Sequence, residues 1–325
     1  MGKESENNKK TRRKFLKKGA AIGIGTASLS GLLSSCSTEK TGETEIEESG
    51  DTVKLLSQDG KLVEVDSSHI HHFKHVSREE SRKGIPGRKF VMVIDLAKCN
   101  NERKCITSCQ KAHNLAPDQE WIKVYLLKDS DKTAYYWFPK PCFHCDNPIC
   151  VSVCPVGATF KRTDGIVLID NKRCIGCKFC MTGCPYSSRI FNWGAPFTQS
   201  EFEPKEEEYS PETSKPGQIG TVSKCDFCPD MIREGELPHC VTACPMGTIY
   251  FGDINEDAVS NGTEVVRFSE LITQRDGYRY AEELGTKPNV YYLSAKDRTY
   301  PVEKGLDNLS EELKEHFKKI LTGKE

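Results

Sequence analysis

Clusters of hydrophobic and aromatic residues mark a series of short strands across the middle of the chain. The first, residues 89–96, reads K-F-V-M-V-I-D-L and is rich in strand-forming residue types. Residues 158–170 read as a strand, an Asp-Gly turn and a second strand, which predicts a β-hairpin. Four further segments have strand-like composition: residues 121–127, 133–138, 247–253 and 289–294.

The hydrophobic period becomes that of a helix near the C-terminus, within an extension formed by residues 296–325. Asn308 and Glu311 have the spacing of a helix N-terminal capping box. The pattern predicts an amphipathic helix over residues 308–321 that packs on the body. Its apolar face contains Leu309, Leu313, Phe317, Ile320 and Leu321.

The N-terminal part of the chain has a different pattern. Residues 36–87 open with an acidic, polar run and have few groups able to form a core, so they are expected to act as a tether. The folded body is therefore expected to span residues 88–295. No apolar run in the sequence reaches the length needed to cross a membrane.

Fifteen of the sixteen cysteines fall into four motifs. The third motif, with Cys174, Cys177, Cys180, Cys184 and then Pro185, has the C-x2-C-x2-C-x3-C-P spacing by which bacterial two-cluster ferredoxins hold 4Fe-4S clusters. In that arrangement three thiolates bind one cluster, and the fourth, which precedes the proline, reaches the neighbouring cluster.

The other motifs are variants of this pattern. The first motif has Glu102 at its second ligand position, which makes this residue a candidate iron ligand or the neighbour of a vacant corner. The fourth motif is expanded between its second and third cysteines. The cysteines of the first, second and fourth motifs are Cys99, Cys105 and Cys109; Cys142, Cys145, Cys150 and Cys154; and Cys225, Cys228, Cys240 and Cys244.

Zinc sites and disulfides are the alternatives. Paired C-x2-C segments also bind zinc, but zinc needs four ligands and gives no reason for a triplet followed by a cysteine before proline. Disulfides would require bridge geometry that thiols two residues apart rarely meet. The spacing therefore favours iron-sulfur clusters.

Composition and charge agree with this interpretation. Only 37% of the residues are hydrophobic, and metal-ligand bonds can supply part of the folding free energy of such a chain. Residues 1–35 carry eight Lys or Arg and two Glu, a net charge of +6, so the remainder must carry −7 to give the total of −1. An acidic body argues against nucleic acid as a partner.

Residues 1–35 have the features of an export signal. Residues 11–17 read T-R-R-K-F-L-K, which resembles the twin-arginine signal of proteins exported in folded form, and a Gly-rich apolar stretch follows. The segment L-S-S-C that ends at Cys36 resembles a lipobox, so Cys36 is expected to be lipidated and to anchor an extracytoplasmic, periplasmic protein to the membrane. A free thiol is the alternative. Four histidines in the tether match no standard metal site and are expected to be solvated or to contact a partner: His69, His71, His72 and His75.

The four motifs in this order resemble the four-cluster iron-sulfur subunits of the dimethyl sulfoxide reductase family. Exported members associated with polysulfide, tetrathionate and nitrite reductases are the most similar. The resemblance covers residues 88–295 and includes V-I-D-L-x-x-C before the first motif, C-V-x-x-C-P-V-G-A in the second and G-T-I-Y-F-G-D after the fourth.

This resemblance implies an α+β fold of two ferredoxin-like modules related by pseudo-symmetry, in which motif one pairs with motif four and motif two with motif three. It also implies four ligand sets, each drawn from two motifs, and three of the clusters would be 4Fe-4S. The first set would hold a 3Fe-4S cluster or a 4Fe-4S cluster with a ligand other than cysteine. We name the sets in chain order: the first set is Cys99, Cys105 and Cys244 with Glu102, the second set is Cys109, Cys225, Cys228 and Cys240, the third set is Cys142, Cys145, Cys150 and Cys184, and the fourth set is Cys154, Cys174, Cys177 and Cys180.

Fully cysteine-ligated clusters transfer single electrons but offer no open position to a substrate. The leading hypothesis is therefore a non-catalytic electron-transfer subunit that links a polytopic, quinone-reactive membrane protein to a catalytic subunit with a molybdopterin cofactor. A second hypothesis is an enzyme that uses an open iron at Glu102. A third is a structural or regulatory zinc protein.

Overall fold

The computed structural model describes residues 52–56, 62–66, 76–194 and 209–322, in two units, Met1–His71 and His72–Glu325. In the first unit, β1 (Thr52–Leu56) and β2 (Leu62–Asp66) form an antiparallel hairpin within the expected tether. The twin-arginine segment, Cys36 and the four tether histidines lie outside the described residues.

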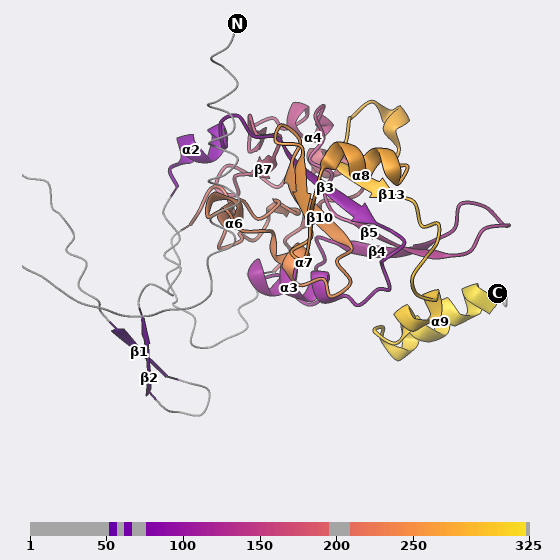
Figure 1. Cartoon of the computed structure of the whole chain (residues 1–325). Helices are drawn as coiled ribbons and strands as arrows, with labels where there is room; N and C mark the ends of the chain where they lie inside the picture. The colour runs from indigo at the N-terminus through magenta and orange to yellow at the C-terminus, as the bar shows by residue number, and fades with distance from the viewer. Residues whose placement is uncertain (1–51, 57–61, 67–75, 195–208, 323–325) are drawn as a thin grey trace, which may run out of the picture. The chain divides into compact units, whose positions relative to one another are not determined.

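A five-stranded sheet forms the centre of the second unit, in the order β12-β11-β10-β3-β13 (Figure 1). Strand β3 (Phe90–Asp95), which lies between β10 and the edge strand β13, is buried along its whole length. β10 (Ile249–Asp253) pairs with β3 antiparallel, with Ile249 opposite Ile94, and β13 (Val290–Leu293) pairs with β3 parallel. Strands β11 (Ala258–Ser260) and β12 (Val265–Val266) extend the sheet beyond β10. The sheet thus joins the start of the body to the segment that follows the fourth motif.

Three two-stranded sheets complete the β-structure described in this unit. β4 (Lys123–Leu127) pairs with β5 (Tyr136–Lys140), and β6 (Thr159–Lys161) pairs with β7 (Val167–Ile169), both antiparallel. β8 (Ile190–Phe191) pairs with β9 (Val222–Ser223). All the strands predicted from sequence are confirmed, including the hairpin between the second and third motifs.

Most helices are one or two turns long. They are α2 (Arg78–Lys83), α3 (Lys104–Ala112), α4 (Ile149–Ser152), α5 (Phe179–Thr182), α6 (Pro229–Arg233), α7 (His239–Thr242), α8 (Phe268–Gln274) and α9 (Glu311–Thr322), with the 3-10 helices η2 (Glu282–Leu284) and η3 (Val302–Leu306). No helix in the described part of the chain is long and apolar enough to cross a membrane.

Helix α2 lies ahead of residue 88, where the body was expected to begin. Ser77 and Glu80 form a capping box at its start, and Arg82 donates a hydrogen bond to the Gly157 carbonyl oxygen at 3.1 Å. The backbone N–H of Ile85 donates to Asp164 at 2.9 Å. These contacts attach α2 to the hairpin of β6 and β7.

The predicted C-terminal helix exists as α9, but it begins at Glu311, so the prediction that Asn308 and Glu311 cap it is wrong. Phe317 of α9 meets Trp137 edge to face, with 5.8 Å between ring centroids, and Leu309 and Leu321 pack on the same cluster. The apolar face therefore contacts the body, as predicted.

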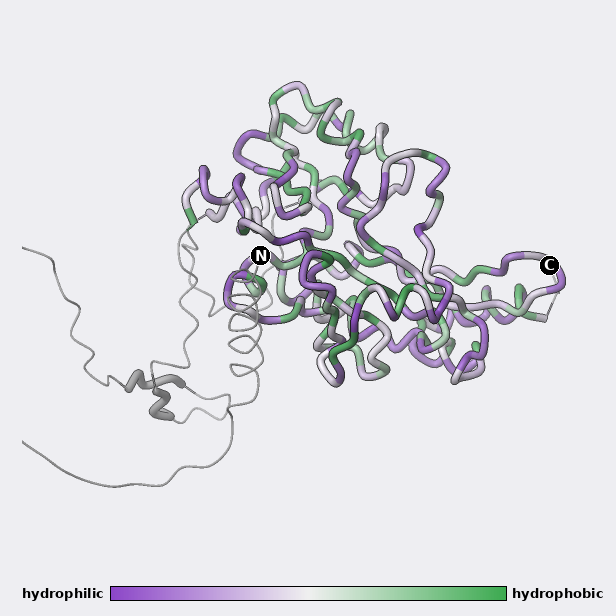
Figure 2. Tube along the Cα trace, turned by 45° about the horizontal axis from the view of Figure 1, so that its top comes forward, coloured by the Kyte–Doolittle hydropathy of each residue, from purple (hydrophilic) through white to green (hydrophobic). Residues whose placement is uncertain are grey.

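The main core lies between the central sheet, the hairpins and the short helices. In Figure 2 the hydrophobic residues, in green, follow the interior strands. Phe138, Phe143 and Tyr292 pack together within this core. Four cysteines are buried in the same cluster, namely Cys109, Cys142, Cys225 and Cys240, and Cys228 is also buried. A core that contains this many thiols indicates that the interior is organised around a metal centre that the thiols bind.

Candidate metal centres

The first and third motifs share one backbone turn. Asn101 and Gly176 have φ of 58° and 69°, and two residues later Arg103 and Lys178 have φ of 57° and 63°. A helix begins immediately afterwards in each, α3 at Lys104 and α5 at Phe179. Glu102 therefore occupies the same backbone position as Cys177, between two left-handed residues.

The cysteines that precede proline also share a local structure. After Cys154 and Cys244 the chain turns, and the N–H of Gly157 and of Gly247 donates to the cysteine carbonyl oxygen at 3.3 and 3.2 Å. Each thiol then accepts a backbone N–H, from Thr159 at 3.5 Å and from Thr248 at 3.4 Å. Proline stops the preceding helix and the turn directs the thiol back toward the strand that follows.

The first and fourth sets each line a cavity. Cys99, Cys105, Cys244 and Glu102 line one, in which Asn100 Nδ2 donates to Glu102 Oε1 at 2.9 Å. All four cysteines of the fourth set line the other. Burial would raise the pKa of Cys154, but backbone N–H donors from Thr159, Val156 and Ala158 outweigh it and lower that pKa. Each cavity thus brings together residues that are distant in the chain and that the family resemblance places in one set.

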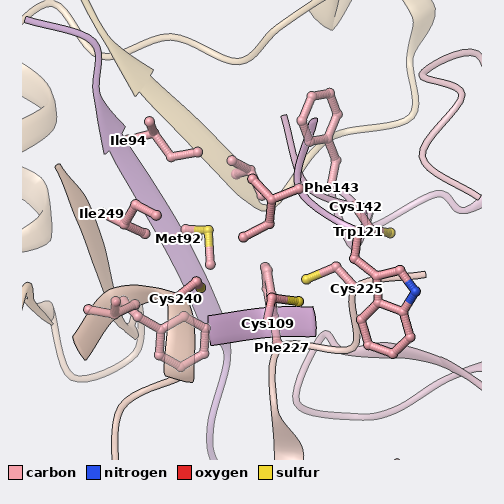
Figure 3. Packing of buried hydrophobic residues seen from close by; sticks show 14 of the residues in the cluster. Met92, Ile94, Cys109, Trp121, Cys142, Phe143, Cys225, Phe227, Cys240 and Ile249 are labelled. Carbon is pink, nitrogen blue, oxygen red and sulfur yellow. The ribbon is translucent and has the colours of Figure 1, made fainter. Parts of the chain in front are cut away.

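The second set lies in the core. Figure 3 shows Cys109, Cys225 and Cys240 among the side chains of Met92 and Phe227. Burial raises the pKa of Cys225 to about 12 and raises the pKa values of Cys109, Cys240 and Cys228 well above the usual range. Buried thiolates need a bound cation to balance their charge. A metal ion both supplies that charge and deprotonates the thiols that coordinate it, so this donor set fits a metal cluster.

The third set is also assembled from two motifs. Burial, and then repulsion from Cys142, Cys150 and Cys184, raises the pKa of Cys145 to about 12. Thiols of two motifs thus influence Cys145, which agrees with the third set that the family resemblance implies.

Electrostatic influence on cysteine pKa values links neighbouring sets. Cys105 of the first set raises the pKa of Cys240 in the second, after burial and Cys225. Cys142 of the third set raises the pKa of Cys225 in the second, after burial and Asp226. The charge of Arg189 lowers the pKa of Cys150 in the third set and of Cys180 in the fourth, against the burial that raises both pKa values. These links join the first set to the second, the second to the third and the third to the fourth.

His144 joins the second and fourth motifs. Its Nδ1 accepts the N–H of Val167 at 3.0 Å, so its Nε2 carries the proton and donates to the Cys225 carbonyl oxygen at 3.0 Å. The ring stacks on Phe227 with 3.7 Å between centroids. Burial lowers the pKa of His144 well below its ordinary value, so it is neutral and acts as a fixed spacer between adjacent ligand loops.

His113, Asp226 and Cys228 form the one group of three ligand residues, among the residues that the structure describes, whose ligand atoms all lie within 4.8 Å of one another. A tetrahedral zinc ion with Zn–S bonds of about 2.3 Å would hold its sulfurs about 3.8 Å apart. No three cysteine sulfurs in the described part of the chain all lie within 4.8 Å of one another. The spacing favours a multi-iron cluster, whose irons bind each thiolate at a separate corner.

Sequence reasoning missed four polar residues at these sites: His113, Arg189, Lys224 and Asp226. Lys224 donates to the Cys225 carbonyl oxygen at 2.8 Å, and His113 Nε2 lies 3.5 Å from Cys228 Sγ. Each follows or precedes a motif cysteine by five residues or fewer. Their adjacency to the motifs was the available signal, but burial is what identifies them.

Comparison with known proteins gives a consistent result. A family model described as a 4Fe-4S dicluster domain matches residues 133–200 and 212–254. The chain is 35% identical to a selenate reductase subunit of Mesobacillus selenatarsenatis, over 90% of this chain and 99% of that one. It is 36% identical to the iron-sulfur cluster-binding subunit of menaquinone reductase of Nitratidesulfovibrio vulgaris, over 64% of this chain and 90% of that one. It is 35% identical to a tetrathionate reductase subunit of Salmonella typhimurium, over 67% of this chain and 77% of that one.

Proposed function

The chain belongs to the family of iron-sulfur subunits, of the dimethyl sulfoxide reductase type, that includes these selenate and tetrathionate reductase relatives, and we propose that it relays electrons through four clusters, one at each cysteine set. Clusters with four cysteine ligands supply one-electron transfer without an open coordination position. The role of the protein is to hold them in sequence and to exclude water from the interior ones.

The observation that carries the proposal is the series of sets. The second and third sets lie in one continuous core, and residues such as Cys142 and Cys225 are close enough to influence each other electrostatically. The two remaining sets line cavities at either end of the series. A chain of adjacent buried redox sites with two outer ends is the arrangement that a relay requires.

The fourth set supports an exit to a partner. Cys177 is exposed, and large apolar side chains are exposed close to it in sequence, among them Ile175 and Phe179. Trp193 is 75% exposed and stacks under the Lys178 ammonium, which lies 3.9 Å from the ring centroid. An exposed apolar surface beside a redox ligand fits a docking site for another subunit.

At the first set we propose a 3Fe-4S cluster, or a 4Fe-4S cluster whose fourth iron is held by Glu102 or water. A carboxylate is a harder and weaker ligand for cluster iron than a thiolate. The shared turn with Cys177 supports Glu102 as the residue that faces this corner.

For partners, we propose a molybdopterin catalytic subunit and a polytopic quinol-reactive membrane subunit. The named relatives are subunits of selenate, tetrathionate and menaquinone reductases, which supports partners of both kinds. We also propose export by the twin-arginine route and anchoring through lipidated Cys36, for which the sequence of residues 1–36 is the support. Replacing both Arg12 and Arg13 by lysine should trap the precursor in the cytoplasm. Cys36→Ala should release the exported protein from membranes.

A second candidate function rests on Glu102. Because this carboxylate lines a cavity at a corner with only three thiols, an open iron could act there as a Lewis acid. Turnover by the isolated chain would favour this activity, whereas turnover only in complex with a second subunit favours the relay.

Metal analysis of the full chain, purified without oxygen, tests the proposed relay. We expect iron and acid-labile sulfide close to four clusters per chain, and visible absorption that is bleached by a reductant. Zinc in place of iron and sulfide would overturn the proposal.

A further inference from the structure

Arg189 is a buried cation between two of the cysteine sets. It immediately precedes β8 and is only 4% exposed. Nη1 donates to Thr159 Oγ1 at 3.2 Å, which holds the guanidinium against the strand that follows Cys154. Its other terminal nitrogen, Nη2, is buried without a hydrogen-bond partner in the described part of the chain.

The contrast with Arg162 shows how unusual this environment is. Arg162 is equally buried, but it pairs with the carboxylates of Asp164 and Glu212. No carboxylate lies at ion-pair distance from Arg189 among the described residues. A buried guanidinium without a carboxylate is costly, so another source of negative charge must compensate it.

Cys150 of the third set packs against the cluster that Cys180 of the fourth set forms with Ile169 and Val222, and we infer that their thiolates are that source. Burial raises the pKa of Cys150 and of Cys180, and the positive charge of Arg189 opposes the rise at both. Conversely, burial would lower the pKa of Arg189, but Cys150, Cys180 and Cys142 outweigh it and raise that pKa. One guanidinium therefore acts electrostatically on thiols of the third set and of the fourth.

We propose that Arg189 is a shared positioning cation that raises the reduction potentials of the clusters at the third and fourth sets together. An incoming electron adds negative charge to a cluster. A fixed positive charge and an N–H donor toward the sulfurs stabilise the reduced form, and low polarity around the site strengthens both effects. Because the same guanidinium serves both sites, it stabilises an added electron at either and shifts the two potentials in the same direction.

This inference rests on the proposed function, and a redox titration of the full-length protein, followed by electron paramagnetic resonance, tests both separately. In Arg189→Met the ratio of reduced to oxidised cluster at a fixed potential should fall at least tenfold at the third and fourth sets, which equals about 59 mV for a one-electron couple. The clusters at the first and second sets should shift less. Arg189→Lys keeps the charge but loses the planar set of guanidinium N–H donors, so its potentials should lie between those of the wild type and Arg189→Met.

Two further variants keep the proposal falsifiable if Arg189→Met fails to load iron. Thr159→Val removes the acceptor for Nη1 while leaving the guanidinium, and should lower the same two potentials by a smaller amount. Lys178→Met removes a cation at the solvent edge of the fourth set, where water screens its charge, and should change them least.

The outcomes separate the two proposals. Absence of clusters from the wild-type protein would defeat the proposed relay itself. Four clusters whose potentials are unchanged in Arg189→Met and Thr159→Val, or shift equally at all four sites, would overturn the role of Arg189 alone.

Discussion

The first and fourth cysteine sets have the same backbone but opposite surroundings. In each, two left-handed residues flank the second ligand position, which is Glu102 in one and Cys177 in the other. Around the first set, Asn101 Nδ2 donates to the Gly305 carbonyl oxygen of η3 at 2.9 Å, and Cys99 packs against the cluster under α9. Around the fourth set, Ile175 and Phe179 are exposed.

This comparison separates two determinants of a metal centre. The turn determines where a ligand side chain points, and it is the same at both ends. The residue at the second ligand position determines the strength of the ligand. The structure that covers the loop determines whether solvent and partners can reach the site. The C-terminal extension provides that cover at the first set, and the described part of the chain leaves Cys177 of the fourth set exposed.

Removal of all iron should have the largest effect. The interior holds buried thiols whose loss of metal leaves an underpacked core, and metal-ligand bonds contribute to the folding free energy. Treatment with an oxidant and a chelator should abolish the cooperative thermal transition seen by near-ultraviolet circular dichroism. The signal of the exposed fourth cluster should disappear before that of the buried second one, and the reverse order would contradict the comparison.

A reciprocal exchange of the second ligands tests whether the two turns are equivalent. Glu102→Cys should convert the first cluster to a conventional 4Fe-4S cluster, and Cys177→Glu should give the fourth a 3Fe-4S signal after mild oxidation. Paramagnetic resonance of the oxidised proteins measures both. If the wild type holds four oxidation-resistant, resonance-silent clusters and Glu102→Ala leaves them unchanged, another residue holds the corner.

Gly176→Ala should damage the fourth set alone. Gly176 has φ of 69°, and an added Cβ would overlap the Gly220 carbonyl oxygen, so the turn must open. Iron content should fall by about one cluster, with the first set intact. Gly217→Ala is the control, because an added Cβ there meets nothing within 4 Å.

Phe317→Ala should have the smallest effect. It removes the ring that packs on Trp137, which we expect to lower the free energy of unfolding by roughly 1–2 kcal/mol. The first cluster should oxidise faster while the fourth is unaffected. Leu313→Ala, at an exposed position of the same helix, should change neither quantity. Equal oxidation of the first cluster in both variants would show that α9 does not shield it.

Sequence patterns were most informative where the local geometry of the chain determines the spacing of residues, as it does within a strand or a cysteine motif. The strand periods predicted β3, β10 and β13 because these patterns recur over a few residues. The patterns were less informative about partners distant in the chain. Nothing local to Arg189 indicates that it is buried against Cys150 and Cys180, and α2 reads as polar because its role is to attach to the hairpin at Asp164. The start of α9 was missed since Asn308 offered a cap three residues before Glu311.

The pairing of β3 with β10 has a consequence for synthesis of the chain. Ile94 can meet Ile249 only after the ribosome has produced the whole segment between them, and Cys99 likewise waits for Cys244. The paired residues are nested in the sequence: Cys142 and Cys184 both lie between Cys109 and Cys225. Closing a long loop costs more entropy than closing a short one. We therefore expect the inner pairs of cysteines to come together first and the N-terminal cysteines to bind their cluster last. A chain interrupted before β10 would then carry an unpaired β3, in which five of the six residues are hydrophobic, and this exposed strand would distinguish the incomplete chain from the complete one.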